Sequence, residues 1–247
     1  KWLSPPYNID GWRLDVAADL GHSPEMNHRF WKDFRRVVKE TNPDALILAE
    51  HYGDASPWLE GDQWDTVMNY DAFMEPLSWF LTGLEKHSDR MDEHLYQNSQ
   101  AFMCAMLSNM SRMQTTSLLA AMNELSNHDH SRFLTRTNRT VGRLDYRGDL
   151  AASEGINFGI FRAAAIIQMT WPGAPTIYYG DEAGVCGWTD PDNRRTFPWG
   201  KENHELIEFH CYLTGIRRRN LAFRTGSFKP LLAEKGLIAY GRFHKRE

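Results

Sequence analysis

The fold of this chain is decided by the stretch ALILAE at residues 45–50, an unbroken apolar run that ends on a carboxylate, Glu50. A short, wholly apolar run is typical of a strand buried on both faces of a parallel sheet. The stretch GWRLD at residues 11–15 has the same arrangement, and SNHD at residues 126–129 follows a third strand-like segment. Carboxylates at the C-terminal ends of parallel strands point into one mouth of a β/α barrel, so the sequence predicts a shared site.

Strand-like and helical segments alternate along the chain. Ser23 and Pro24 mark the start of a helix, as N-cap and first helical residue, and the pair at 42–43, Asn-Pro, marks its end. We expect strands at 9–16, 45–49, 65–70, 118–125 and 176–179, helices at 24–42, 158–169 and 204–219, a mostly helical stretch at 72–110 broken near 88–89, and an exposed loop at 139–149. After Phe223 the apolar period shortens toward two, which predicts strands of a small β domain.

This alternation favours an α/β fold with a parallel sheet and covering helices. The five strands before the final β segment are fewer than the eight of a complete barrel. The strand count therefore indicates the later part of a barrel, although about 250 residues is an ordinary length for a whole one. The chain also begins at Lys1, without a Met, and ends in a strand-like segment. We expect a piece of a longer protein.

The composition argues against several classes of function. Hydrophobic residues are 42% of the chain and charged residues 24%, which indicates a folded protein. The net charge of −4 comes from interspersed acids and bases, so no nucleic-acid partner is expected. No apolar run reaches transmembrane length, so no membrane partner is expected either. The three cysteines, Cys104, Cys186 and Cys211, match no metal or disulfide spacing, which favours a reducing, cytoplasmic location.

Five phrases, taken together and in order, identify a family. They are YNIDGWRLD at 7–15, AEHYGDA at 49–55, MNY at 68–70, PGAPTIYYGDE at 172–182 and DPDNRR at 190–195. With them the chain resembles the α-amylase superfamily, glycoside hydrolase family 13, and most of all its maltodextrin glucosidase, neopullulanase and cyclomaltodextrinase branch. The resemblance implies a TIM (β/α)8 barrel, of which residues 1–224 form strands four to eight, followed by the start of a C-terminal all-β domain at 225–247.

The resemblance also implies catalytic roles. Asp15 matches the nucleophile of a retaining glycosidase, and Glu50 matches the general acid/base that protonates the leaving oxygen. Arg13 lies two residues before Asp15, hence on the same face of the strand, where its charge would keep Asp15 ionised. Asp129 would hold sugar hydroxyls and favour the distorted ring. The alternatives are a structural Arg13–Asp15 pair and a helix-capping Glu50.

Four further residues match substrate-binding positions. His128 would hydrogen-bond the same sugar as Asp129, although a lone histidine is often a core residue. Tyr52 lies where this branch places an aromatic residue on the leaving-group side. Asp190 and Arg194 resemble the pair that contacts the second sugar on the non-reducing side, but a solvated surface ion pair explains them equally well. The 13% aromatic content fits a sugar cleft lined by a few flat rings.

The sequence therefore predicts a retaining α-glycosidase that hydrolyses α-1,4-linked maltodextrins or cyclodextrins through a covalent glycosyl-enzyme, with no metal and no cofactor. Starch-degrading amylases carry Lys-His where this chain has Ala18 and Asp19, which favours short maltodextrins. Two alternatives remain: a glucan transglycosylase with the same mechanism, and a non-catalytic sugar-binding or partner module. The present chain, with open barrel edges, is predicted to be inactive alone and to associate through those edges.

Overall fold

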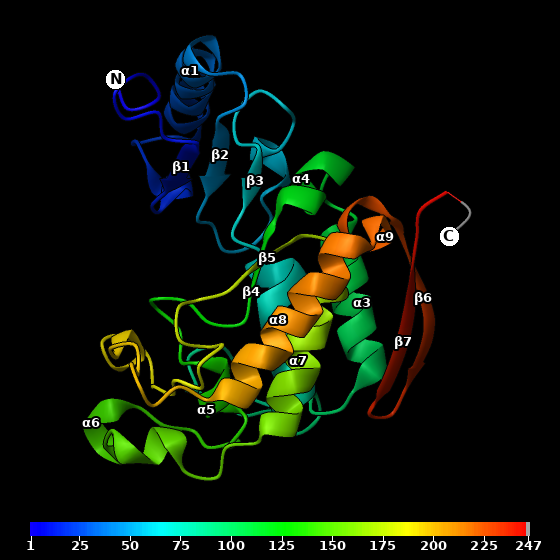
Figure 1. The fold of residues 1–247 in the computed structure, drawn as a ribbon. Coiled ribbons are helices and arrows are strands. Elements are labelled where there is room, and N and C mark those ends of the chain that lie inside the picture. The colour runs from blue at the N-terminus through cyan, green and yellow to red at the C-terminus, as the bar shows by residue number, and fades with distance from the viewer. Residues whose placement is uncertain (246–247) are drawn as a thin grey trace.

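The computed structural model describes residues 1–245 as five short parallel strands with helices packed around them, followed by a two-stranded hairpin (Figure 1). The strands are β1 Gly11–Leu14, β2 Leu46–Ala49, β3 Thr66–Val67, β4 Met122–Glu124, β5 Ala174–Thr176, β6 Ser227–Glu234 and β7 Leu237–Phe243. The helices are α1 Pro24–Thr41, α2 Glu75–Thr82, α3 Ser99–Met110, α4 Thr115–Ala120, α5 Phe133–Arg136, α6 Leu144–Arg147, α7 Phe158–Thr170, α8 His204–Arg219 and α9 Leu221–Thr225.

The first five strands are parallel and follow one another in chain order. β1 pairs with β2, with Gly11 opposite Leu46, and β2 pairs with β3. A parallel bridge between Met68 and Met122 joins the β3 region to β4, and β4 pairs with β5. Gly11 permits the first pairing because a Cβ at this position would collide with the Leu46 carbonyl oxygen. All five strands therefore direct their C-terminal ends the same way, as the sequence predicts.

The local signals at the first helix are confirmed. The Ser23 side chain accepts a hydrogen bond from the Met26 N–H at 3.3 Å, and Pro24 is the first helical residue. Trp31 and Val38 on the inner face of α1 are buried against β1 and β2, in a core of their own. A larger core lies among α2, α3, α5 and α7. The N-terminal strands and α1 thus form one lobe, and the remaining helices gather in another (Figure 1).

The last predicted strand is displaced. The prediction was 176–179, whereas β5 ends at Thr176. The reason is that Tyr178 and Tyr179 contact the Arg132 side chain and do not pair with a neighbouring strand. The Arg132 guanidinium lies 4.1 Å from the Tyr178 ring centre and 4.9 Å from that of Tyr179, and it donates to the Tyr179 carbonyl oxygen at 2.6 Å.

Other predicted bounds are also corrected. The strand expected at 9–16 is limited to β1, and the one expected at 65–70 passes from β3 into a π-helix at Tyr70–Met74. The helical stretch at 72–110 is interrupted over 83–98, because Gly83 adopts a left-handed conformation (φ 74°) and ends α2. The loop expected at 139–149 contains the one-turn helix α6.

The hairpin of β6 and β7 is antiparallel and packs on the larger core. Phe228 and Tyr240 contact Trp171, with ring centres 4.5 Å and 4.8 Å from its ring. That this hairpin starts an all-β domain, and that a domain boundary lies at 224–225, stay predictions. Residues 246–247 of the predicted domain lie outside the described residues. In the described part of the chain, no helix is both long and apolar enough to cross a membrane.

Candidate active site

Arg13 joins the two principal carboxylates. Asp15 directly follows β1 and Glu50 directly follows β2, and the parallel register brings these strand ends side by side. Arg13 Nη1 lies 2.5 Å from Asp15 Oδ1, and its Nη2 lies 3.3 Å from Glu50 Oε2. Burial of the guanidinium lowers the pKa of Arg13, but the hydrogen bond to Asp15 and the charge of Glu50 outweigh this and raise it. Arg13 is therefore a fixed cation between two carboxylates.

The two carboxylates have different surroundings. The Asp15 side chain is 79% exposed, whereas that of Glu50 is 9% exposed. Glu50 Oε2 also accepts the backbone N–H of Val16 at 2.9 Å. Val16 has a left-handed backbone (φ 43°), which is costly for a β-branched residue and places its N–H toward Glu50. One carboxylate is open to a ligand and the other is held in a fixed, enclosed position.

The turn after β4 presents the third acidic group. His128 Nε2 lies 3.5 Å from Asp129 Oδ2, and both side chains are 36% exposed. The Asn127 side-chain oxygen accepts the backbone N–H groups of Asp129 and His130, each at 3.0 Å. His128 shares with Arg13 the lining of a cavity of about 300 Å³. The structure therefore brings the β4 turn to the same end of the strands as the Arg13 pair.

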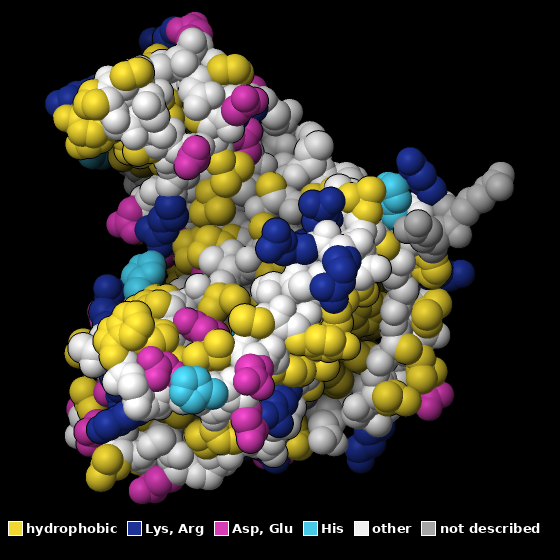
Figure 2. Space-filling view, in the orientation of Figure 1, with side chains coloured by type: hydrophobic (Ala, Val, Ile, Leu, Met, Phe, Trp, Pro, Cys, Tyr) yellow, Lys and Arg dark blue, Asp and Glu magenta, His cyan; other side chains and the backbone are white. Residues whose placement is uncertain are grey.

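The hollowed face of the molecule lies between the two lobes. Figure 2 shows a concavity at the left of the view, with acidic, basic and histidine side chains around it. The strands of the N-terminal lobe and the β4 turn lie on opposite sides of this region in Figure 1. A concave surface on which a few polar groups converge is a usual setting of a small-ligand site.

Tyr52 lies next to this group. Its ring stacks on Tyr70, with ring centres 4.5 Å apart and an angle of 18°, and its hydroxyl lies 3.1 Å from His130 Nε2. Partial burial raises the pKa of Tyr52 to about 12, so the hydroxyl stays neutral. Lys86 Nζ lies 5.3 Å from the centre of the Tyr52 ring. Tyr52 is 44% exposed, so it keeps a surface for contact with a ligand.

Asp190 and Arg194 form an ion pair on the following loop. Arg194 Nε lies 2.6 Å from Asp190 Oδ1, and both side chains are 48% exposed. The Asp190 N–H donates to the Asp129 carbonyl oxygen at 3.4 Å, which places this loop against the β4 turn. Buried Asn193 fixes the loop further, since its side chain donates to the carbonyl oxygens of Asn127 and His130 at 3.0 and 2.8 Å. The sugar-contacting role of the pair stays a prediction.

Sequence reasoning missed the polar residues behind this surface, chiefly Glu124, Asn127 and His130. Glu124 is 1% exposed and His130 is fully buried. Burial raises the pKa of Glu124 to about 8 and lowers that of His130 to about 2, so both are neutral near pH 7. The available signal was an acidic residue, Glu124, inside a segment predicted to be a buried strand.

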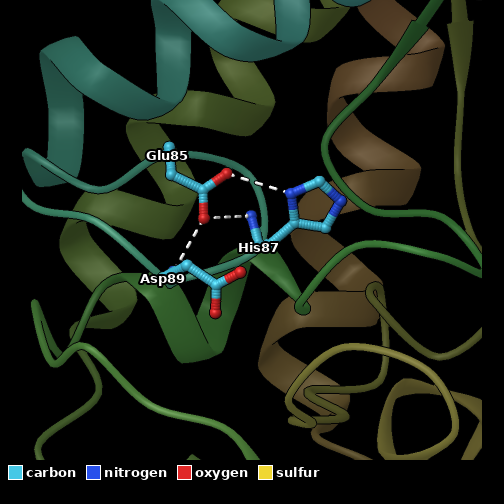
Figure 3. A group of neighbouring side chains, drawn as sticks. All are labelled: Glu85, His87 and Asp89. Atoms are coloured by element: carbon cyan, nitrogen blue, oxygen red, sulfur yellow. Dashed lines mark hydrogen bonds and ion pairs between the residues drawn. The ribbon is translucent and has the colours of Figure 1, made fainter.

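A second polar cluster, of Glu85, His87 and Asp89, has the composition of a cation site (Figure 3). Its contacts explain it as a hydrogen-bonded turn. One Glu85 oxygen faces the His87 ring at 3.0 Å, and the other accepts the N–H groups of His87 and Asp89 at 2.9 and 2.7 Å. The Asp89 carboxylate pairs with Arg143. The turn supports the site from behind, because the His87 and His130 rings meet edge to face at 4.8 Å.

Comparisons with known proteins match this architecture. Residues 1–214 match the family model "Alpha amylase, catalytic domain". The chain is 41% identical over 234 residues to neopullulanase 2 of Thermoactinomyces vulgaris, and 37% identical over 238 residues to a cyclomaltodextrinase of Bacillus sp. These matches cover 94% and 95% of this chain but 34% and 36% of the relatives. The chain therefore spans about a third of the length of these curated relatives.

A solved structure gives the same result. The debranching enzyme from Nostoc punctiforme superimposes with a TM-score of 0.80 at 32% identity, over 97% of this chain and 46% of that one. The structural neighbours are TIM-barrel glycoside hydrolases. Family model, relatives and superposition agree with one another, and the chain belongs to the α-amylase family.

Proposed function

We propose that this chain carries the catalytic carboxylates of a retaining α-glycosidase acting on α-1,4-linked maltodextrins or cyclodextrins. The observation that carries the proposal is the contact of one guanidinium, that of Arg13, with both Asp15 and Glu50. A shared cation keeps the two carboxylates close together, and retaining enzymes need a carboxyl separation of about 5–5.5 Å. The names of the relatives, a neopullulanase and a cyclomaltodextrinase, support the substrate class.

In the proposed first step, exposed Asp15 attacks the anomeric carbon while Glu50 donates a proton to the leaving glycosidic oxygen. The C–O bond breaks and a covalent glycosyl-enzyme forms on Asp15. Glu50 then removes a proton from water, which attacks the anomeric carbon and releases Asp15. The Val16 N–H and Arg13 both hold Glu50 Oε2, so they leave Glu50 Oε1 as the oxygen for proton transfer.

The other residues would bind the sugar. His128 and Asp129 would hydrogen-bond the reacting ring, and the exposed face of Tyr52 would contact the leaving-group sugar. Asp190 and Arg194 would contact the next sugar on the non-reducing side. The same two steps with a sugar acceptor would make a transglycosylase, and the exposed Tyr52 is where an acceptor would lie.

We also propose that β1 to β5 correspond to strands four to eight of the family barrel. The complete enzyme would then be a longer chain that supplies the remaining strands, and the present chain alone would be inactive. The parallel chain-order pairing and the one-third coverage of relatives support this assignment. The free, separate cysteines support the predicted cytoplasmic location.

The test of the proposed function is made on the complete enzyme. Fresh product from maltotriose should keep the anomeric form of the substrate by NMR, and Asp15→Ala should lower kcat by roughly 10³-fold or more. Inverted product would refute the mechanism, and near-normal turnover of Asp15→Ala would refute the nucleophile. Binding of maltotriose without turnover in the unmodified enzyme would favour the non-catalytic module.

A further inference from the structure

Glu124 is a buried acid that the proposed chemistry does not use. It ends β4, is 1% exposed, and lines the cavity of about 300 Å³ beside Arg13 and His128. Its Oε1 accepts a hydrogen bond from Asn127 Nδ2 at 2.7 Å, the one side-chain hydrogen bond that residues 1–245 give it. A buried carboxyl group opposes folding unless its contacts compensate, so its presence calls for a physical explanation.

The explanation lies in the Asn127 amide. Its nitrogen donates to Glu124 Oε1 and to the Tyr70 hydroxyl at 3.2 Å, while its oxygen accepts the N–H groups of Asp129 and His130. All donors and both acceptor positions of the amide are thereby used. A flipped amide would set its NH2 group against the backbone N–H groups of Asp129 and His130 and leave both without an acceptor. The network therefore permits one orientation.

We propose that Glu124 is a positioning residue that holds Asn127, and through Asn127 the backbone turn that presents His128 and Asp129. The contacts run from Glu124 to the Asn127 side chain, and from Asn127 to the backbone N–H groups of Asp129 and His130. The claim that Glu124 positions the turn rests on these hydrogen bonds alone. That the turn faces a sugar rests on the proposed function.

The charge of the site is consistent with this role. Burial raises the pKa of Glu124 to about 8, against the lowering effects of Asn127 and Arg13, with Asp181 and Asp129 adding to the rise. A neutral Glu124 still accepts from Asn127 through its carbonyl oxygen, and it leaves Arg13 to Asp15 and Glu50. The titratable and charged groups that interact with it from the surrounding elements are Arg13 in β1, Tyr52 after β2, Tyr70 in the π-helix, Asp129 in the turn, Arg136 in α5 and Asp181 after β5.

The experiment measures amide hydrogen exchange at single-residue resolution in the complete enzyme. Glu124→Leu removes the acceptor, and Glu124→Gln keeps a carbonyl oxygen for Asn127. Met122→Leu is the matched control, since Met122 lies on the same strand and lines the same cavity. Glu124→Leu should speed exchange of the Asp129 and His130 amides by roughly tenfold relative to amides in β2. Glu124→Gln and Met122→Leu should stay within about threefold of the parent chain.

A double-mutant comparison tests whether Glu124 acts on the turn through Asn127. Asn127→Ala should speed the same two amides, and adding Glu124→Leu to it should change them no further. Unchanged exchange in Glu124→Leu, equal acceleration over the whole chain, or no rescue by Glu124→Gln would each overturn the proposal. None of these outcomes depends on turnover, so a failure of the glycosidase assay would leave this result standing, and the reverse also holds.

Discussion

The Val16 N–H donates to Glu50 Oε2 at 2.9 Å, across 34 positions of sequence, from a backbone conformation that a β-branched residue rarely adopts. The residue after the proposed nucleophile thus holds the proposed acid/base. The strained backbone directs the Val16 N–H at the carboxylate, while Arg13 Nη2 lies 3.3 Å from the same oxygen. Strain of this kind gathers at functional sites, where the surrounding structure maintains it.

This relationship predicts the effect of Val16→Gly. Glycine adopts φ near +43° without the cost of about 1–2 kcal/mol that an L-residue meets, but it loses about 0.5–1 kcal/mol through chain entropy. Because the Val16 side chain is half exposed, little packing is lost. We expect the free energy of unfolding, from urea titration, to change by less than about 1 kcal/mol. A loss well beyond that range would show that the Val16 side chain, and not its backbone, supports the site.

Glu50→Gln tests the acid role in the complete enzyme. The variant keeps an oxygen for the Val16 N–H but has no proton to donate, so hydrolysis of maltotriose should fall by roughly 10²–10⁴-fold. An activated aryl α-glucoside, whose leaving group needs no proton, should retain much more of its glycosylation rate. Glu208→Gln, at an exposed position of α8, serves as a control for the loss of a carboxylate. Equal damage on both substrates would contradict the assignment of Glu50 as the acid.

Much of this site was predictable from sequence, for a physical reason. Asp15 and Glu50 directly follow the short strands β1 and β2, and Asp129 lies on the turn after β4. The C-terminal ends of parallel strands bring such positions to one edge. The burial of Glu124 was indicated by its place in a predicted buried strand, but its role was not predictable, because that role depends on the side-chain amide of Asn127, three residues away. The displacement of β5 has a similar cause: Arg132, distant in sequence, takes the Tyr179 carbonyl oxygen that a longer strand would need.

The buried carboxyl groups of Glu85 and Glu124 should contribute with opposite sign to the pH dependence of stability. Burial alone would raise the pKa of Glu85, but hydrogen bonds from His87 and Asp89 outweigh it and lower the pKa to about 2. The stability that Glu85 contributes is therefore present above the pKa of the unfolded state, about 4.5, and is lost as the pH falls toward 2. The pKa of Glu124 is raised to about 8, so its contribution is present below about 4.5 and is lost as pH rises toward 8.

Urea titrations from pH 2.5 to 9 check this contrast. Glu85→Gln should flatten the acid side of the stability curve, and Glu124→Gln should flatten the fall between about pH 5 and 8. Glu154→Gln, at an exposed position, is the control and should leave both slopes close to those of the parent chain. If Glu85→Gln and Glu124→Gln altered the same side of the curve, the assignment of opposite shifts would be wrong.

The last prediction concerns the edges of the strand array. Within residues 1–245, β1 pairs only with β2 and β5 pairs only with β4, so each leaves one edge open. Unpaired parallel edges recruit other chains, and apolar side chains beside them strengthen the contact. α1 adds such a surface, since Met26, Phe30 and Val37 are 55%, 47% and 53% exposed. We therefore expect the 247-residue chain, made alone, to associate and to be inactive on maltotriose.

Light scattering after size-exclusion chromatography measures the association, and two variants separate its causes. Thr176→Lys puts a charge on the open β5 edge and should raise the monomer fraction if strands pair there. Phe30→Lys removes the largest exposed apolar side chain of α1. It should raise the monomer fraction if the chains associate mainly through the surface of α1. We expect the larger effect from Thr176→Lys, because unpaired backbone groups at an edge are satisfied by a partner strand and a lone apolar stripe is not directional. A monomeric parent chain that hydrolyses maltotriose at enzymatic rates would show that strands from a longer chain, as proposed above, are dispensable.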